Sequence, residues 1–197
     1  RKIIMMYPHY YENIQGWFNS GFRRMYDYQV KNCKDNAHFI EVGAWKGKST
    51  CYMGVEILNS EKTIKFDVVD TWLGSEESAH KKDSSIINNS LYEEFLENIE
   101  PVKSAINPIR MTSIEASKLY EDNSLDFVLI DASHKYIDVK EDIINWLPKV
   151  RKGGILAGDD FSWSGVRRAL KELLPNKYQT AQEFFGAKHK MIWIHKK

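Results

Sequence analysis

From residue 38 onward, short apolar runs alternate with helical stretches, and this alternation constrains the fold more than any other feature of the sequence. Five apolar runs are expected to form strands, at His38–Val42, Ile64–Val69, Ala105–Arg110, Leu125–Ile130 and Ile155–Ala157. Several are continuously apolar, which is typical of strands buried on both faces of a parallel sheet. Helices are expected between and after them, at Ser49–Leu58, Ser85–Ile99, Ser113–Tyr120, Tyr136–Leu147 and Ser164–Leu174.

The last part of the chain breaks this alternation. Tyr178–Ala181 and Met191–His195 are expected to be strands joined without a helix, so they should pair antiparallel. The predicted fold class is therefore α/β, a Rossmann-like doubly wound sheet that is mostly parallel. Its last strand is reversed in a C-terminal hairpin, and helices cover both faces. Ligands of such sheets bind beyond the carboxyl ends of the strands, so candidate site residues are sought there.

Length and composition indicate one domain with a short appendage. The chain has 197 residues, and its first part is rich in aromatic residues. Phe18, Phe22, Met25 and Tyr26 recur at helical spacing within that part. We therefore expect a helical N-terminal extension at residues 1–37 and one functional domain at residues 38–197.

Charge and cysteine content narrow the class of protein. Lys and Arg total 28 and Asp and Glu total 27, so bulk charge gives no support for a nucleic-acid binder. No apolar run approaches the ~18–20 residues of a membrane span, and residues 1–11 do not resemble a signal peptide. Cys33 and Cys51 cannot build a disulfide framework. A cytoplasmic location is therefore expected.

The first expected strand runs into a glycine loop and then a helix, in the segment FIEVGAWKGKST at residues 39–50. It ends like a phosphate-binding P-loop, but three residues separate Gly43 from Gly47 where that motif needs four. Glu41 would also repel a bound phosphate. A dinucleotide fingerprint needs Gly-x-Gly-x-x-Gly, which the segment lacks.

A third interpretation of the loop is Glu-x-Gly-x-x-x-Gly, with the acid two residues before the first glycine. The Glu41 carboxylate suits a cationic amine, whereas the loop amides and Ser49 suit a carboxylate. A single ligand that carries both groups is an amino acid. A plain tight turn between strand and helix remains the structural alternative.

Acidic residues also end three later strands. Asp70 follows the second, at a position where an acid can accept hydrogen bonds from ribose hydroxyls. Asp131 ends the fourth, and Asp159 and Asp160 end the fifth. Three neighbouring carboxylates repel one another unless a cation or protons relieve them. Oxygen ligands favour Mg²⁺, Mn²⁺ or Ca²⁺ over zinc, although each acid could instead cap a helix or end a strand.

The loop and the acid after the second strand, FIEVGAWKGKST and FDVVDTWLG, resemble class I S-adenosylmethionine-dependent methyltransferases. Within that superfamily they are similar to the metal-dependent small-molecule O-methyltransferases, of the catechol and antibiotic-sugar type. The resemblance covers residues 38–197.

The resemblance implies a role for each residue at the strand ends. Glu41, Gly43, Ala44, Gly47 and Ser49 would hold the methionine end of the cofactor, Asp70 its ribose, and Trp72 with the Ser113–Ile114 turn its adenine. Asp131 would border the cofactor and, with Asp159 and Asp160, bind a divalent cation, most simply Mg²⁺. His134 lies three residues after Asp131, where the catechol enzymes carry the lysine that takes the acceptor proton. Histidine is chemically suited to that role, so Asp131 and His134 are the expected catalytic residues, with a structural His134 as the alternative.

The sequence thus predicts an enzyme that transfers the methyl group of S-adenosylmethionine to a hydroxyl of a small molecule, assisted by a divalent cation. We expect no nucleic-acid or membrane partner, and the prediction leaves room for a homodimer. Two alternatives stay open: a P-loop-like ATP-dependent phosphotransferase, and a non-catalytic nucleoside-binding module of the same fold. Residues 71–85 are polar and long enough for a lid, and the N-terminal aromatics and Trp163 are candidate pocket walls.

Overall fold

The computed structural model describes residues 6–75, 78–188 and 190–197, with the side chains of residues 78 and 79 left aside. Within these residues one seven-stranded sheet runs in the order β3-β2-β1-β4-β5-β7-β6. Its strands are β1 (Ala37–Val42), β2 (Ile64–Asp70), β3 (Asn107–Arg110), β4 (Leu125–Ile130), β5 (Val150–Gly158), β6 (Gln179–Thr180) and β7 (Trp193–Lys196).

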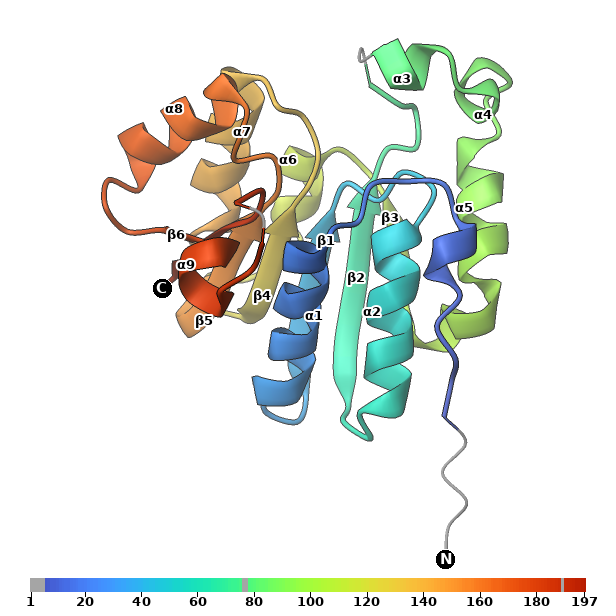
Figure 1. Cartoon of the computed structure of the whole chain (residues 1–197), viewed down its shortest axis with the longest axis horizontal. Helices are drawn as coiled ribbons and strands as arrows, with labels where there is room; N and C mark the ends of the chain where they lie inside the picture. Colours follow the sequence, from blue (N-terminus) through green and yellow to red (C-terminus); the bar gives the residue numbers. More distant parts are fainter. Residues whose placement is uncertain (1–5, 76–77, 189) are drawn as a thin grey trace, which may run out of the picture.

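Helices cover both faces of this sheet (Figure 1). The described α-helices are α1 (Ser20–Asn32), α2 (Lys48–Asn59), α3 (Ser78–Lys81), α4 (Ser84–Ile87), α5 (Leu91–Ile99), α6 (Ser113–Ser117), α7 (Tyr136–Trp146), α8 (Ser164–Leu173) and α9 (Ala181–Phe185). Two short 3-10 helices, η1 (Tyr11–Asn13) and η2 (Glu100–Ala105), precede α1 and β3.

Alternate residues of the central strands enter two separate cores. Phe39 of β1 and Phe127 of β4 belong to the core beneath α1, α2 and α5. Ile40 and Val128, one residue further along the same strands, belong to the core beneath α6, α7 and α8. Because both faces are buried, the strands read as continuous apolar runs, which is the pattern that the sequence shows.

The predicted fold class is confirmed. The first five strands pair in parallel, and β5–β7 and β6–β7 pair antiparallel. The direct hairpin was wrong, because the short helix α9 lies between β6 and β7. Thr180 and Glu183 form a reciprocal capping box that starts this helix at the point where a hairpin turn was expected.

The N-terminal segment is built into the same core as the sheet. Phe22, Met25 and Tyr26 of α1 are fully buried, and the Tyr26 ring packs edge-on against Phe127 of β4. The helix predicted from the spacing of these aromatic residues is therefore present, and it covers one face of the sheet rather than standing apart from it. No helix in the described part of the chain is long and apolar enough to cross a bilayer.

Candidate active site

A cavity of about 880 Å³ lies at the carboxyl ends of the parallel strands. Val42, Val69, Asp131 and Asp159 border it from the ends of β1, β2, β4 and β5. Its size falls within the ~300–1,000 Å³ typical of small-molecule sites. This is the edge at which a doubly wound sheet binds its ligands.

The glycine loop forms the floor of the cavity, and Gly43 explains its shape. Gly43 has φ +90°, and a Cβ atom built on it would lie 1.9 Å from the backbone oxygen of Asp131. Only glycine allows β1 and β4 to approach so closely at their carboxyl ends. Gly47 has φ +84° and begins α2, but it packs against Phe95 and does not line the cavity.

Glu41 lies beneath the loop, not in the cavity. Its carboxylate is fully buried and accepts hydrogen bonds from the hydroxyls of Ser49 and Thr50, the latter at 2.7 Å. Burial raises the pKa of Glu41 to about 7, although both hydroxyls counteract that shift. Gly43, Ala44 and Ser49 do line the cavity, so the loop backbone and Ser49 face this space. Glu41 contacts Ser49 from the side away from the cavity.

Asp70 ties the loop to the end of β2. One of its carboxylate oxygens accepts the amides of Ala44 and Trp45, at 2.8 and 3.0 Å, and the other accepts the amide of Trp72 at 2.8 Å. The residue also lines the cavity. A carboxylate has about four acceptor positions, so three backbone amides leave capacity for a ligand hydroxyl.

The structure places the residues expected near adenine in different surroundings. Trp72 is 2% exposed, packs against Tyr92 and Phe95, and does not line the cavity. Its large apolar ring is drawn into the core beside α5, which differs from the expected position beside a ligand. Ser113 lines the cavity, whereas its neighbour Ile114 does not.

Ser113 is held by two buried partners. Its hydroxyl donates to Asp142 and accepts a hydrogen bond from the indole nitrogen of Trp146 at 2.8 Å. Burial raises the pKa of Asp142 to about 7. One lone pair of the Ser113 oxygen therefore remains for a donor in the cavity.

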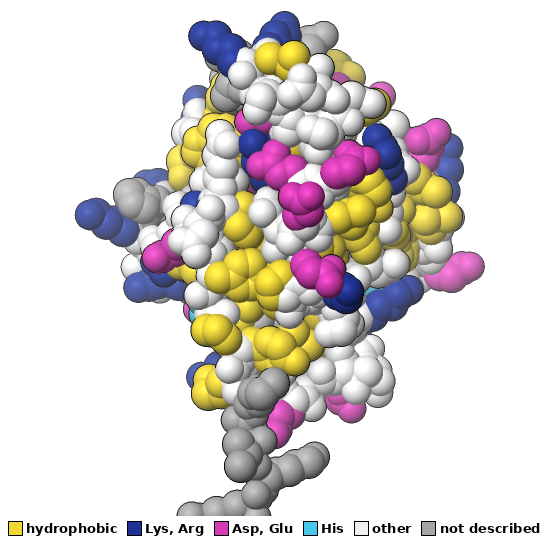
Figure 2. All heavy atoms as spheres, turned by 90° about the vertical axis from the view of Figure 1, so that its right-hand side faces the viewer, with side chains coloured by type: hydrophobic (Ala, Val, Ile, Leu, Met, Phe, Trp, Pro, Cys, Tyr) yellow, Lys and Arg dark blue, Asp and Glu magenta, His cyan; other side chains and the backbone are white. Residues whose placement is uncertain are grey.

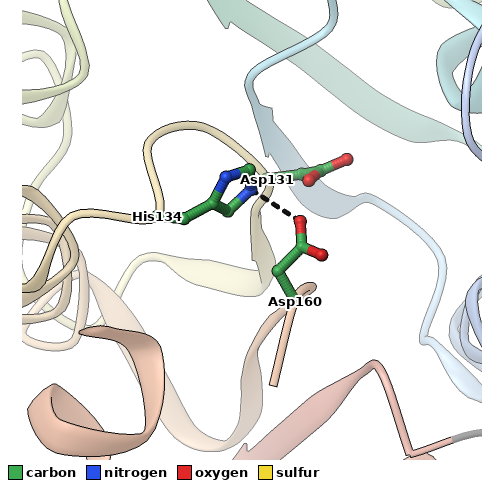
Figure 3. A group of neighbouring side chains, drawn as sticks. All are labelled: Asp131, His134 and Asp160. Atoms are coloured by element: carbon green, nitrogen blue, oxygen red, sulfur yellow. Dashed lines mark ion pairs between the residues drawn. The ribbon is translucent and has the colours of Figure 1, made fainter. Parts of the chain in front are cut away.

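Asp131, His134 and Asp160 meet above the ends of β4 and β5 (Figure 3). Their ligand atoms all lie within 4.8 Å of one another, close enough for one metal ion. Nε2 of His134 pairs with a carboxylate oxygen of Asp160 at 2.6 Å. Asp160 has φ +57°, an uncommon backbone conformation for a residue other than glycine that is typical of functional sites.

This grouping differs from the predicted metal ligands, Asp131, Asp159 and Asp160. His134 takes the third position in the group, and Asp159 stands outside it. One Asp159 carboxylate oxygen is buried without a hydrogen-bond partner among the described residues. Burial, reinforced by the neighbouring Asp160 carboxylate, raises the pKa of Asp159 to about 7.

His134 is held in place by its neighbours. Its ring stacks on Trp163, with centroids 4.9 Å apart. A Cβ atom on Gly165 would lie 2.4 Å from the His134 carbonyl oxygen, so the glycine lets the start of α8 approach this loop. Trp163 also lines the cavity, as the sequence suggested.

Three aromatic rings cover part of the cavity. The Trp17 and Trp45 rings are stacked with centroids 5.0 Å apart, and Trp45 and His80 are stacked at 5.3 Å. All three residues line the cavity. Trp17 lies in the N-terminal aromatic segment that was expected to form a wall. His80 lies in the polar segment 71–85 that was expected to form a lid. Trp45 was not among the expected wall residues, although an aromatic residue inside a glycine loop is a signal that could have indicated it.

The seven-stranded sheet, with its last strands reversed and a cavity at its carboxyl edge, has the class I methyltransferase fold. The comparisons with known proteins agree with this assignment. Residues 40–161 match the family model described as a methyltransferase domain, so the chain belongs to the methyltransferase-domain family.

Individual relatives are more distant. Among curated proteins, y4gI of Sinorhizobium fredii is 24% identical over 159 residues, which is 81% of this chain and 16% of that protein. The chain thus spans about one sixth of that relative's length.

Solved structures share the fold. The O-methyltransferase NovP has a TM-score of 0.59 at 16% identity, covering 90% of this chain and 79% of its own. A Streptococcus mutans protein in complex with SAH (S-adenosylhomocysteine) has a TM-score of 0.56 at 11% identity, covering 91% and 99%. An rRNA methylase from Streptococcus thermophilus has a TM-score of 0.54 at 10% identity, covering 92% and 99%.

Proposed function

We propose that the protein transfers the methyl group of S-adenosylmethionine to a hydroxyl group of a small molecule, with the help of a divalent cation. One observation carries the proposal: a single cavity brings Asp70 and the glycine loop together with Asp131, His134 and Asp160. The first set suits a nucleoside joined to an amino acid, and the second suits a hydroxyl that must lose its proton.

The cofactor part of the proposal rests on the floor of the cavity. Ala44 and Trp45 keep the loop against Asp70, and the backbone of Gly43 borders the space in which the methionine end would lie. Ser49 borders the same space. Asp70 would accept a ribose hydroxyl through its remaining acceptor position.

The acceptor part rests on the group at the ends of β4 and β5. Asp131, His134 and Asp160 would hold the cation. The two carboxylates suit Mg²⁺ or Mn²⁺, and the imidazole shifts the preference from the Mg²⁺ predicted from oxygen ligands alone toward a transition metal such as Mn²⁺. A bound cation lowers the pKa of a coordinated hydroxyl. Without it, the pair of His134 with Asp160 is placed to accept the acceptor proton.

For the methyl transfer itself, the main task of the chain would be to position the acceptor oxygen relative to the methyl group. The cavity walls would hold the acceptor oxygen in line with the methyl group, and a fixed near-attack geometry lowers the entropic part of the barrier. The aromatic walls formed by Trp17, Trp45 and Trp163 would exclude water from that region. A small-molecule acceptor and the absence of a nucleic-acid partner belong to this proposal.

Calorimetry with SAH and with ATP tests the cofactor. We expect SAH to bind and ATP not to bind, because the loop is one residue short of a P-loop and Glu41 lies beneath it. Binding of ATP without SAH would instead support the phosphotransferase alternative.

A methyl-transfer assay with labelled S-adenosylmethionine tests catalysis. A panel of phenols, sugars and an rRNA fragment is offered as acceptors, each with Mn²⁺, with Mg²⁺ and with EDTA. We expect label on a hydroxyl compound and its loss with EDTA. Unchanged activity in EDTA would contradict the cation and leave His134 as a base. Cofactor binding with no transfer to any acceptor would support the non-catalytic alternative.

A further inference from the structure

Lys46 is a buried lysine at the centre of the glycine loop. Its side chain is only 5% exposed, although lysine is rarely buried without partners. The ammonium group contacts Asp83 at 2.9 Å, Glu94 at 3.1 Å and Gln15 at 3.0 Å. An ammonium group has three N–H donors, so these three acceptors satisfy it completely.

The partners of Lys46 belong to segments that cover the cavity. We call the roof Gly16–Asn19 of the N-terminal segment together with Gly74, Ser75 and His80 of the chain after β2, all of which border the cavity. Gln15 directly precedes the first of these stretches, and Asp83 follows His80 by three residues. Figure 1 shows the N-terminal segment passing above the start of α2. Gly16 packs there against Lys48.

Lys46 also steadies the rings of the roof. Its ammonium nitrogen lies 5.2 Å from the centroid of the Trp45 ring, and the Trp45 ring stacks on Trp17 and His80. The carbonyl oxygen of Lys46 accepts a hydrogen bond from Asn98 of α5 at 2.9 Å. Lys46 of the glycine loop is therefore joined to α5 and to Gln15 and Asp83, which flank the two stretches of the roof.

The three contacts of the ammonium group differ in strength. Asp83 is 6% exposed, so its ion pair with Lys46 is shielded from water and salt. Glu94 is 35% exposed and lies on α5, a helix that carries Glu93, Glu94 and Glu97. Figure 2 shows the side of the molecule on which α5 lies, where acidic side chains gather at the surface. The pair with Asp83 should therefore contribute most.

We propose that Lys46 is a positioning residue that holds the roof against the cofactor loop, and so sets the space available to the acceptor. The proposal rests on the proposed function for the nature of the ligands. The contacts themselves do not depend on it, because they join the roof and the loop whichever ligand the cavity takes. In this arrangement Lys46 acts through its contacts with Asp83, Gln15 and Trp45.

The first test compares Lys46→Met with Lys62→Met. Lys62 donates hydrogen bonds to the carbonyls of Val30, Lys31 and Cys33 at 2.8–2.9 Å, at the end of α1. Both variants lose a lysine that makes three hydrogen bonds, and both should lower the melting temperature. Only Lys46→Met should release the roof.

Limited trypsin digestion without ligand measures that release. Lys81 and Lys82 are exposed and lie between His80 of the roof and Asp83. In Lys46→Met we expect cleavage after them to accelerate about tenfold to hundredfold, the change expected from losing one charge-assisted hydrogen bond. The near-ultraviolet circular dichroism of the Trp17–Trp45 stack should change as well. In Lys62→Met neither signal should change beyond about twofold.

A second variant keeps the proposal testable if Lys46→Met folds poorly. Asp83→Asn retains an N-cap for α4, where Asp83 accepts the amide of Ser85 at 3.0 Å, and replaces the charged acceptor oxygen that faces Lys46 with an amide donor. We expect faster cleavage in this variant too. The double variant should be no faster than Lys46→Met alone, because both changes remove the same interaction.

Two results would overturn the proposal. One is a cleavage rate in Lys46→Met or in Asp83→Asn that equals the wild-type rate. The other is an acceleration of cleavage in Lys62→Met as large as that in Lys46→Met. Calorimetry with SAH on the same proteins separates this outcome from the proposed function. If the wild-type protein binds no SAH, the methyltransferase proposal is contradicted. The cleavage result still tests the role of Lys46, because the digestion is carried out without ligand. A wild-type protein that binds SAH while Lys46→Met is cleaved like wild type contradicts the role of Lys46 alone.

Discussion

Gly43 directly follows β1 and packs against the backbone of Asp131 at the end of β4, and the addition of one methyl group tests this close approach. In Gly43→Ala the added Cβ would meet the Asp131 carbonyl oxygen at 1.9 Å, at a φ that alanine disfavours. We expect the free energy of unfolding to fall by about 3 kcal/mol or more in urea denaturation. Gly186→Ala is the matched control, because Gly186 has φ +64° and nothing within 4 Å. It should cost only about 1–2 kcal/mol. Equal losses in the two variants would show that the close approach does not matter.

Asp142 should make stability depend on pH. Its pKa is raised by burial from 3.8 to about 7, so the folded state binds more protons than the unfolded state between these values. The stability that Asp142 contributes is therefore present below about pH 4 and is lost as the pH rises to about 7, by up to about 4 kcal/mol. Asp142→Asn should flatten the fall in unfolding free energy between about pH 4 and 7.

The slope should not vanish in Asp142→Asn, because Glu41 and Asp159 have pKa values raised in the same direction. Asp122→Asn serves as the control, since Asp122 is 61% exposed and pairs with Lys149 at the surface. It should leave the slope as in wild type. An identical slope in Asp142→Asn and wild type would show that Asp142 does not titrate in this window.

At the scale of elements, the bounds of a strand were predicted best where the strand is buried on both faces of the sheet. The predicted strand Leu125–Ile130 is β4 itself, because every residue of that strand is buried and the run is bounded by polar residues. The expected helix Ser85–Ile99 proved to be α4 and α5, separated at Asn88–Ser90. The side chain of Asp83 caps the first of these helices. Apolar periodicity carries no information about such a break, since both helices present apolar residues to the same core.

The site was predictable only in part, because the sequence pattern gives the order of the strands but not the packing of the side chains at their ends. Chain order places Asp70, Asp131 and Asp160 at one edge of a parallel sheet, and the structure brings these residues to one cavity. Which side chains face that cavity depends on packing. Trp72 is buried in the core, and His134 rather than Asp159 joins Asp131 and Asp160 in the group that could hold a metal ion, because loop conformation decides both. Lys46 gave no signal in the sequence, since its partners lie 31, 37 and 48 residues away along the chain.

The helix α1 should be necessary for folding, because it carries part of the main core. Phe22 is fully buried and contacts Phe18 and Tyr26. Phe22→Ala should lower the free energy of unfolding by about 3–5 kcal/mol, from lost burial and the cavity left behind. Trp17→Ala, five residues earlier, should cost less than about 1 kcal/mol, because Trp17 is 64% exposed. Denaturation of both variants in urea decides the point, and a small loss in Phe22→Ala would make α1 an appendage.

At the scale of the whole molecule, a net charge of +1 conceals an uneven distribution. Asp70, Asp131, Asp159 and Asp160 all border one cavity at one edge of the sheet. The positively charged residue Lys48, in the glycine loop, lines the same cavity. An acidic edge of this kind costs stability through mutual repulsion unless protons or cations relieve it. The raised pKa of Asp159 is one sign of that cost.

Ligands should therefore stabilise the whole chain, and they should do so through separable residues. A ligand at about 100 times its Kd stabilises a protein by about 2.7 kcal/mol, which for a chain of this size raises the melting temperature by about 5–10 °C. We expect SAH and Mn²⁺ each to raise the melting temperature in differential scanning fluorimetry. Asp70→Ala should remove the shift caused by SAH and keep the shift caused by Mn²⁺.

Asp160→Asn should remove the shift caused by Mn²⁺ and keep the shift caused by SAH. Asparagine tolerates the left-handed backbone at this position, with φ +57°, so the loop should keep its shape. If Asp160→Asn kept the full Mn²⁺ shift, the ion would bind elsewhere. If Asp70→Ala kept the full SAH shift, the ribose contact would be misplaced.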